Sequence, residues 1–305
     1  MATSADLEPL PHAPAPWHFT GSSWIIPLHA PFSEKPVPLP AGSYAPFETG
    51  STADISDRFH GGLGLILVMR YDTSDVGPYD ELILIPGLFS NKHEGEDKVR
   101  YDWAISRIIV SSDRSTVNGR PEWGMPKHRG IFSFTRTGPS STLITVAHPT
   151  SPSKPYFRTL VRDSRATPFP LPISTSWLSL GAIKPLLAGY APSLVQRPLP
   201  PASASAGISA GRLEELRQTG QRADAFVACP EPLRVDFAAT GRVRIAVVEP
   251  APLSDGVGPG EEGDDEGEFG DGVAFPRLRP YSRGLNFHMT SFDMDLAKGI
   301  VLKLE

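Results

Sequence analysis

The stretch Asn118-Gly-Arg-Pro-Glu-Trp-Gly-Met-Pro-Lys-His128 places a lysine directly after two residue types that constrain the backbone. Pro126 fixes a φ angle next to Lys127, and Gly124 permits a close backbone approach that a side chain would block. We therefore expect a tight turn that holds Lys127 in a defined position. Lys127 is the candidate nucleophile, and the alternative is a surface lysine beside a turn proline.

Upstream, the stretch Gly77-Pro-Tyr-Asp-Glu81 connects two apolar runs. Residues 65–69 are continuously apolar, as in a strand covered on both faces, and residues 81–85 form a second run that closes at Pro86. The pattern predicts a strand, a turn and a second strand. Glu81 then begins the second strand, either as a carboxylate that lines a cavity or as a strand-end carboxylate in water.

The rest of the chain also favours short strands over long helices. It contains 33 prolines and 28 glycines, which interrupt or weaken helix interiors. We expect further strands at 24–28, 105–110, 130–137, 143–146, 242–248 and 286–296, a short helix at 211–222 and a loop at 198–210. Residues 177–187 suit a strand or a helix equally. The predicted fold class is mainly β (β-rich α+β), an antiparallel meander or barrel-like sheet with few short helices.

The domain organisation predicted from these patterns is a single domain over residues 17–305, preceded by a flexible arm over residues 1–16. Residues 254–272 are rich in glycine and acidic residues. Like charges repel one another and this segment offers little apolar surface to bury, so we expect a disordered insertion. A cation site is the alternative, but metal-binding loops space their ligands at fixed offsets and this segment does not.

Composition excludes several classes of function. The chain has 305 residues and a formal net charge of -5, whereas nucleic-acid binders usually carry a basic surplus. Its one cysteine, Cys229, rules out an internal disulfide and a cysteine-rich zinc site, and no His-Glu-x-x-His motif occurs. No apolar run approaches the about 18 residues of a membrane span, and the N-terminus lacks a signal-peptide pattern. We expect a cytoplasmic protein with no metal, no cofactor, no nucleic-acid partner and no membrane association.

Together, the stretches 71–81 and 118–127 resemble the acetoacetate decarboxylase family. The first is similar to that family's Gly-x-Tyr-x-Glu turn, and the second to its Gly-Arg-Glu-x-x-Gly-x-Pro-Lys segment. The resemblance implies a β-cone or barrel-like fold around an apolar cavity, with possible assembly into homo-oligomers. It also implies that Lys127 forms a Schiff base, and that Glu81 orients the substrate or exchanges protons with it. Arg120 then either pairs with Glu81 inside the cavity or belongs to a structural ion pair. Residues expected to line the substrate pocket are Tyr79, Glu122, Trp123, Met125, His128 and Ile66.

The chain departs from the family pattern at four positions. His128 replaces a second lysine, Pro121 replaces the glutamate after Gly-Arg, and Ile66 aligns with another family glutamate. Ser22 aligns with an arginine of the first strand. The groups that bind and expel a carboxylate are therefore incomplete, although the amine is retained.

An amine can still do useful chemistry without those groups. A neutral amine condenses with a ketone to an iminium ion, which withdraws electrons so that a carboxylate, a proton or an aldol fragment can leave the neighbouring carbon. Enclosure in an apolar cavity favours the neutral form of an amine, a device for which acetoacetate decarboxylase is a standard example. The sequence thus predicts a decarboxylase-like lyase, or aldol or dehydratase chemistry on a keto substrate. The alternative is a protein of secondary metabolism that binds a hydrophobic ligand without a covalent bond, or a cyclase or isomerase that uses the same cavity.

Overall fold

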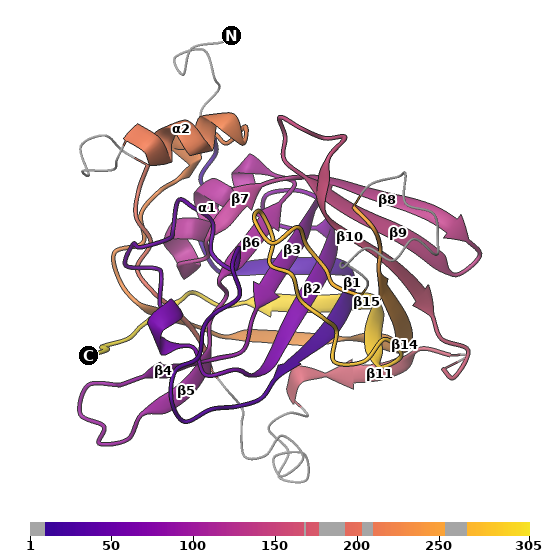
Figure 1. The fold of residues 1–305 in the computed structure, drawn as a ribbon, viewed down its shortest axis with the longest axis horizontal. Helices are drawn as coiled ribbons and strands as arrows, with labels where there is room; N and C mark the ends of the chain where they lie inside the picture. Colours follow the sequence, from indigo (N-terminus) through magenta and orange to yellow (C-terminus); the bar gives the residue numbers. More distant parts are fainter. Residues whose placement is uncertain (1–9, 168, 177–192, 203–209, 254–266) are drawn as a thin grey trace.

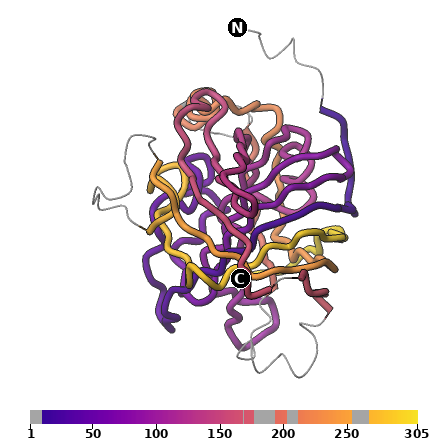
Figure 2. The backbone as a smooth tube through the Cα atoms, turned by 90° about the vertical axis from the view of Figure 1, so that its right-hand side faces the viewer, coloured from indigo at the N-terminus to yellow at the C-terminus, as the bar shows by residue number. Residues whose placement is uncertain are grey.

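One large twisted sheet, built from β-branched and aromatic segments, organises the chain. The computed structural model describes residues 10–167, 169–176, 193–202, 210–253 and 267–305. The sheet runs in the order β7 (Lys127–Arg129), β6 (Arg107–Val110), β3 (Tyr79–Ile85), β2 (Gly62–Thr73), β1 (Trp17–Ala30), β15 (Asn286–Leu296), β14 (Phe237–Pro250), β10 (Pro155–Asp163), β9 (Ser141–Ala147) and β8 (Ile131–Gly138) (Figure 1). β11 (Leu171–Ser174) pairs with β14 beside this path. The N-terminal β1 and the C-terminal β15 lie side by side at the centre of the sheet (Figure 2).

A smaller sheet and two helices complete the described elements. This sheet has the order β16 (Ile300–Val301), β13 (Leu233–Val235), β12 (Leu194–Gln196), β5 (Arg100–Trp103) and β4 (Leu88–Asn91). The helices α1 (Asp113–Trp123) and α2 (Ala210–Gln218) lie on the same side of the molecule as β7 (Figure 1). Short 3₁₀ turns occur at Ser56–Arg58 and Ala223–Ala225.

The alternation of side chains along β2, β3 and β6 separates two apolar cores. Side chains of one face join the lysine-side core, which includes Met69, Tyr71, Tyr79, Ile108 and Trp123. Those of the other face join the far-side core, which includes Ile66, Val68, Leu82, Leu84 and Ile109. Because successive residues of a strand point to opposite faces, a residue's place in the strand decides which core it joins.

The predicted mainly β class is confirmed, and most of the predicted strands fall within observed strands. Two details of the architecture were wrong. The large sheet does not close on itself, since β7 and β8 remain its unpaired edges among the described strands. The sheets are also mixed, because β6 pairs with β7 and β12 pairs with β5 in parallel. The prediction missed β4, β5, β7, β10, β11, β12, β13 and β16, most of which are short.

The turn expected over residues 118–127 is in fact the end of a helix. The Ser112 side chain accepts a hydrogen bond from the backbone N–H of Ser115 and so caps the start of α1. Gly124 ends the helix in the left-handed conformation at φ 66°, which glycine adopts without steric cost. Pro121 lies in the last turn of the helix. The prediction of a turn rested on the proline and the glycines of this stretch and did not use Ser112 as a helix cap.

Two segments expected to be loose are partly packed. Residues 10–16 lie along α1, where the backbone N–H of Ala13 donates to the Asn118 side chain and the amide of Asn118 donates to the carbonyl of Pro11. At the end of the acidic segment, Phe269 is fully buried in the far-side core and bridges to Leu278. The acidic residues 254–266 and the stretch 177–187 lie outside the described residues.

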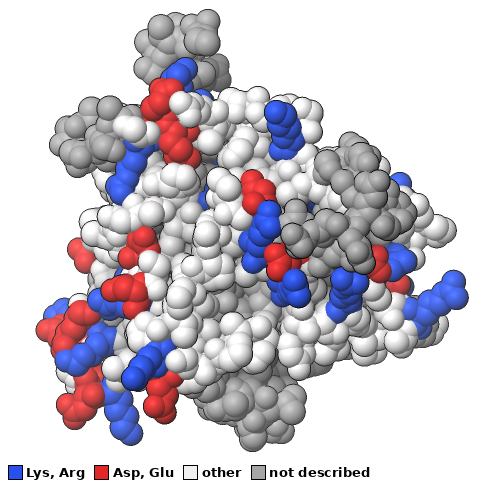
Figure 3. Space-filling model, in the orientation of Figure 1, with Lys and Arg blue, Asp and Glu red and all other residues white. Residues whose placement is uncertain are grey.

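The surface carries both signs of charge. On the face in Figure 3, basic and acidic side chains are interspersed. Among the described helices, none has the length and apolar character needed to cross a membrane.

Candidate functional site

The amine of Lys127 is enclosed by three side chains from two elements, β3 and α1. Its Nζ lies 3.0 Å from Oε2 of Glu81 on β3 and 2.9 Å from Oγ of Ser115 on α1. It also lies 5.5 Å from the ring centroid of Tyr79. Lys127 and Glu81 are each only 3% exposed. The structure thus brings together three of the predicted site residues, Lys127, Glu81 and Tyr79, and adds Ser115, which no sequence pattern had indicated.

Strand register places Lys127 on the inner face. β7 pairs with β6 in parallel, with Lys127 opposite Ile108, a member of the lysine-side core. Glu81 pairs with Met69, another member of that core. The two side chains therefore project from β7 and β3, the strands on either side of β6, into the same interior, where water is excluded and their ion pair is strengthened.

Gly119 of α1 makes room for the lysine side chain. A Cβ atom at this position would lie 2.7 Å from Cε and 3.2 Å from Nζ of Lys127. Glycine is unfavourable inside a helix by roughly 0.5–1 kcal/mol relative to alanine, so its presence here has a packing reason. The stem of Lys127 crosses the helix directly over Gly119.

We expect Gly119→Ala to displace the amine from Glu81 and Ser115. The added methyl overlaps a buried side chain, and overpacking of this kind costs about 1–3 kcal/mol of unfolding free energy. The matched control is Gly211→Ala in α2, where nothing lies within 4 Å and we expect a gain of roughly 0.5–1 kcal/mol. Urea unfolding of both variants measures the difference. Equal stabilisation by the two alanines would mean that Lys127 does not rest on Gly119.

Two buried tyrosines stand beside the pair. The rings of Tyr71 and Tyr79 are 4.6 Å apart. Burial, reinforced by the negative charge of Glu81, raises the pKa of both hydroxyls well above the usual value, so both stay protonated. No side chain or backbone group of the described residues bonds to the buried hydroxyl of Tyr79. This hydroxyl is a donor available to a polar atom near the amine.

Arg120 belongs to a different buried cluster. Its Nη1 lies 2.9 Å from Oε1 of Glu48, and Nε2 of His128 lies 2.7 Å from Oε2 of the same carboxylate. All three residues are at most 5% exposed, and the Arg120 guanidinium stacks over the ring of Phe226 at 4.5 Å. Arg120 therefore does not pair with Glu81, because Glu81 pairs with Lys127 and Arg120 forms a structural ion pair with Glu48.

The charges in this cluster support each other. Burial opposes ionisation of Glu48, but His128 and Arg120 outweigh it and lower the pKa of Glu48 to about 2. Burial lowers the pKa of His128 despite the nearby carboxylate. Arg120 also donates to the main-chain carbonyl of Lys127 at 3.4 Å, so this cluster anchors the backbone of the lysine rather than its amine.

The other predicted pocket residues are spread over several environments. The indole N–H of Trp123 donates to the carbonyl of Ala297, and Met125 packs in the lysine-side core. Glu122 accepts from the backbone N–H of Ala15 near the surface. Ile66 lies in the far-side core, so the sheet separates it from Lys127. Its alignment with a family glutamate had counted residues along the strand, and a shift of one residue changes the face.

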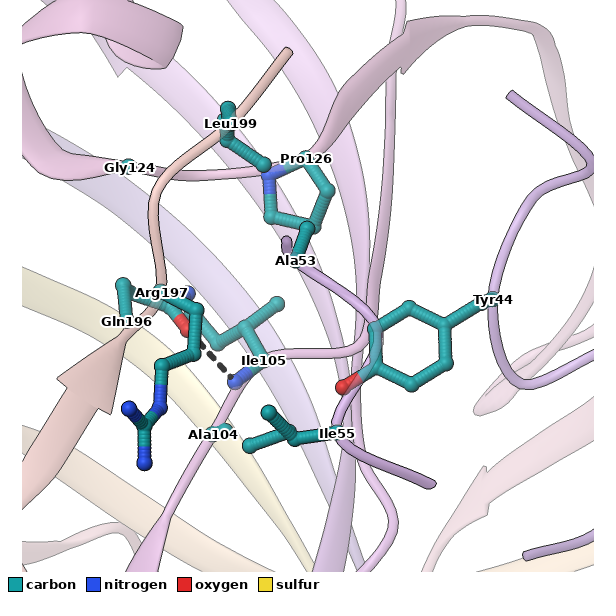
Figure 4. Close-up of a pocket in the computed structure, with 10 residues that line it drawn as sticks. All are labelled: Tyr44, Ala53, Ile55, Ala104, Ile105, Gly124, Pro126, Gln196, Arg197 and Leu199. Atoms are coloured by element: carbon teal, nitrogen blue, oxygen red, sulfur yellow. Dashed lines mark hydrogen bonds between the residues drawn. The ribbon is translucent and has the colours of Figure 1, made fainter. Parts of the chain in front are cut away.

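Two hollows lie near these residues. One, of about 320 Å³, is lined by Arg70, Tyr71, Asp72, Pro78, Tyr79, Asp80 and Ser111. Tyr79 lines this hollow, and the ring of the same residue also lies beside the Lys127 amine. The second, of about 10 Å³, is lined by Gly124, Pro126, Gln196, Arg197 and neighbouring apolar residues, and is too small for more than a water molecule (Figure 4). No cluster of three or more histidine, cysteine or acidic side chains suited to a metal ion occurs among the described residues.

Comparison with known sequences finds short matches. The chain is 37% identical to Protein NEOXANTHIN-DEFICIENT 1 of Oryza sativa subsp. japonica over 73 residues, which are 24% of this chain and 22% of that protein. It is 31% identical to the protein of the same name from Solanum lycopersicum over 118 residues, 39% of this chain and 35% of that protein. The matched stretch thus spans well under half the length of these relatives. No protein-family model matches the chain.

Comparison with solved structures finds likeness along most of the chain. Acetoacetate decarboxylase from Legionella pneumophila subsp. pneumophila str. Philadelphia 1 is similar with a TM-score of 0.48 and 12% identity, over 95% of this chain and 88% of that one. The enduracididine biosynthesis enzyme MppR is similar with a TM-score of 0.47 and 14% identity, over 95% of this chain and 89% of that one. The chain therefore resembles acetoacetate decarboxylase and MppR at low identity, and NEOXANTHIN-DEFICIENT 1 over a shorter stretch.

Proposed function

We propose that this protein is a divergent acetoacetate decarboxylase-like enzyme in which Lys127 forms a Schiff base with a ketone or aldehyde. The observation that carries the proposal is the buried contact of the Lys127 amine with Glu81 at 3.0 Å and Ser115 at 2.9 Å. Burying this ion pair costs the hydration free energy of both charges, and a packing role alone does not require a charged side chain at this position.

The pair provides the proton transfers that imine formation needs. Transfer of a proton from the ammonium to Glu81 leaves a neutral amine and a neutral acid, which removes both charges from apolar surroundings. The amine then attacks the carbonyl carbon, and one N–H proton moves to the carbonyl oxygen to give a carbinolamine. Glu81 gives its proton to this hydroxyl group, which leaves as water. The resulting iminium ion acidifies the neighbouring C–H bonds, and the Glu81 carboxylate accepts a proton from that carbon. Ser115 and the hydroxyl of Tyr79 can donate to the carbonyl oxygen before it leaves.

The arrangement favours neutral carbonyl substrates over keto acids. Arg120, one candidate partner of Glu81 in the sequence, instead pairs with Glu48, so it does not contact the amine. The walls around the pair are aromatic and aliphatic, including Tyr71, Tyr79 and Val110. We therefore favour aldol or dehydratase chemistry, or carbon–carbon cleavage of a neutral compound, over expulsion of carbon dioxide.

Exchange of hydrogen for deuterium next to a ketone carbonyl tests this function without knowledge of the substrate. In D₂O the wild-type protein should label ketones from acetone to long-chain methyl ketones faster than an equal concentration of free lysine. Glu81→Gln should lower the exchange rate by about 10²–10⁴-fold, the usual contribution of a general acid or base. Mass spectrometry of the ketone measures the label. An unchanged rate in Glu81→Gln would remove Glu81 from the chemistry.

The second candidate is a binding protein or a cyclase or isomerase that holds an apolar ligand without a covalent bond. The partly exposed members packed against the lysine-side core favour it, namely Leu65, Leu67, Met289 and Met294. Such a protein binds an apolar ligand but catalyses no exchange above the free-lysine rate. The exchange assay therefore separates the two candidates.

A further inference from the structure

A second polar site lies on the opposite face of the sheet. Arg107 precedes Ile108 on β6, and it pairs with Leu84 of the far-side core. Since adjacent residues point to opposite faces, Arg107 projects away from Lys127. This arginine is only 4% exposed, and its Nε and Nη1 atoms have no hydrogen-bond partner in the described part of the chain. An unpaired buried guanidinium is costly, so its retention calls for a binding partner.

Two of the three acidic groups near Arg107, Glu48 and Asp271, are already engaged elsewhere. Both oxygens of Glu48 accept from Arg120 and His128. Oδ1 of Asp271 accepts from the backbone N–H groups of Val273, Ala274 and Phe275. Both carboxylates are close enough to influence the charge of Arg107, but neither bonds to it. Neither Glu48 nor Asp271 therefore pairs with the guanidinium of Arg107, and Glu215 is the remaining carboxyl near it.

Other side chains with unused polar atoms surround the same place. Nδ1 of His148, at the end of β9, and Oε2 of Glu215 on α2 are buried without a partner among the described residues. The ring of His148 lies 4.7 Å from that of Tyr156 on β10, and Tyr156 also influences the charge of Arg107. Both His148 and Glu215 are partly exposed as whole residues, so the group opens toward solvent between α2 and the ends of β9 and β10.

We propose that Arg107, His148, Tyr156 and Glu215 form a second binding site, which takes the oxyanion of a small ligand, a carboxylate or a phosphate group. The guanidinium supplies charge and planar donors that match an oxyanion. Burial raises the pKa of the Tyr156 hydroxyl, which therefore stays a donor. Burial and the charge of Glu48, opposed by Arg107, raise the pKa of Glu215 to about 7, so this carboxyl can also donate near neutral pH. The site is independent of the proposed Schiff-base chemistry, because the sheet lies between them.

Thermal unfolding with inorganic phosphate and with acetate, each against sodium chloride at equal ionic strength, tests the site. We expect a concentration-dependent rise in the melting temperature of the wild type with one or both probes. Arg107→Met should respond to neither probe, and it should melt no lower than the wild type without them, because it removes an uncompensated buried charge. Arg114→Met, at an exposed position of α1, is the matched control and should respond like the wild type. A response to phosphate alone identifies the ligand group as a phosphate, and a response to acetate alone identifies it as a carboxylate.

Glu215→Gln gives a second, independent test that does not depend on the folding of the arginine variant. It removes a negative charge that faces the bound anion, so calorimetric titration at pH 8 should show binding tightened about three- to tenfold. Lys127→Met should leave the anion response unchanged, which separates this site from the proposed function. The proposal is overturned if neither probe exceeds chloride, if Arg107→Met responds like the wild type, or if Glu215→Gln binds no tighter.

Discussion

Replacing Lys127 by methionine is expected to lower the rate of deuterium exchange into ketones to the rate that the same concentration of free lysine gives. The reason is that the side chain keeps its length and apolar stem but loses the only nitrogen in contact with both Glu81 and Ser115. No other described residue supplies an amine to this interior contact. The matched control is Lys154→Met, at an exposed position, which should keep the wild-type rate.

The same replacement also leaves Glu81 buried without its partner. Removal of one member of a buried ion pair commonly costs about 3–5 kcal/mol. We therefore expect the double variant Lys127→Met/Glu81→Gln to recover stability in urea unfolding while it remains inactive. Activity in the double variant would contradict the proposed role of the pair, and an inactive, stable double variant would exclude unfolding as the cause of the loss.

Glu48→Gln is expected to destabilise the protein by about 3–5 kcal/mol, because it leaves Arg120 as an uncompensated charge in the interior. Both oxygens of Glu48 accept hydrogen bonds, and a glutamine amide offers one oxygen and a competing donor. The exposed pair of Glu214 and Arg217 provides the matched control, where Glu214→Gln should leave the unfolding midpoint close to that of the wild type. Guanidinium unfolding midpoints measure both; a loss under about 1 kcal/mol for Glu48→Gln would show that this cluster does not anchor α1 and β7.

The effect of Glu48 depends on pH with a defined sign. The ordinary pKa of 4.5 is lowered to about 2 in the folded protein. Stabilisation by this carboxylate is therefore complete above about pH 4.5 and is lost as the pH falls through about 2. The stability difference between the wild type and Glu48→Gln should narrow over that range.

Local sequence patterns predicted many of the strands of the large sheet. The runs 65–69 and 81–85 form the central hairpin of β2 and β3, because continuous apolar stretches are buried on both faces. Lys127 and Glu81, which lie in contact, belong to the two stretches from which the site was predicted. Short strands such as β12 and β13 escaped prediction because three residues carry no clear period, and they exist through pairing with distant segments.

Side-chain partners were harder to predict than strands. Glu48 lies in a proline-rich stretch without a motif, yet it decides where Arg120 points. Ser115 reaches the amine only because α1 folds back over β7, an arrangement with no local signal. Ile66 was assigned to the wrong face, since counting residues cannot detect the bulge or turn length that sets register. Such contacts depend on tertiary structure, which a single sequence does not reveal.

The most direct test of the account is the location of a trapped imine. The wild-type protein is incubated with a methyl ketone and sodium borohydride, digested, and analysed by mass spectrometry. We expect the reduced adduct on the peptide that carries Lys127, faster than on exposed lysines such as Lys35, Lys98 and Lys303. Labelling spread evenly over the exposed lysines, with Lys127 unmodified, would contradict the assignment of Lys127 as the reactive amine.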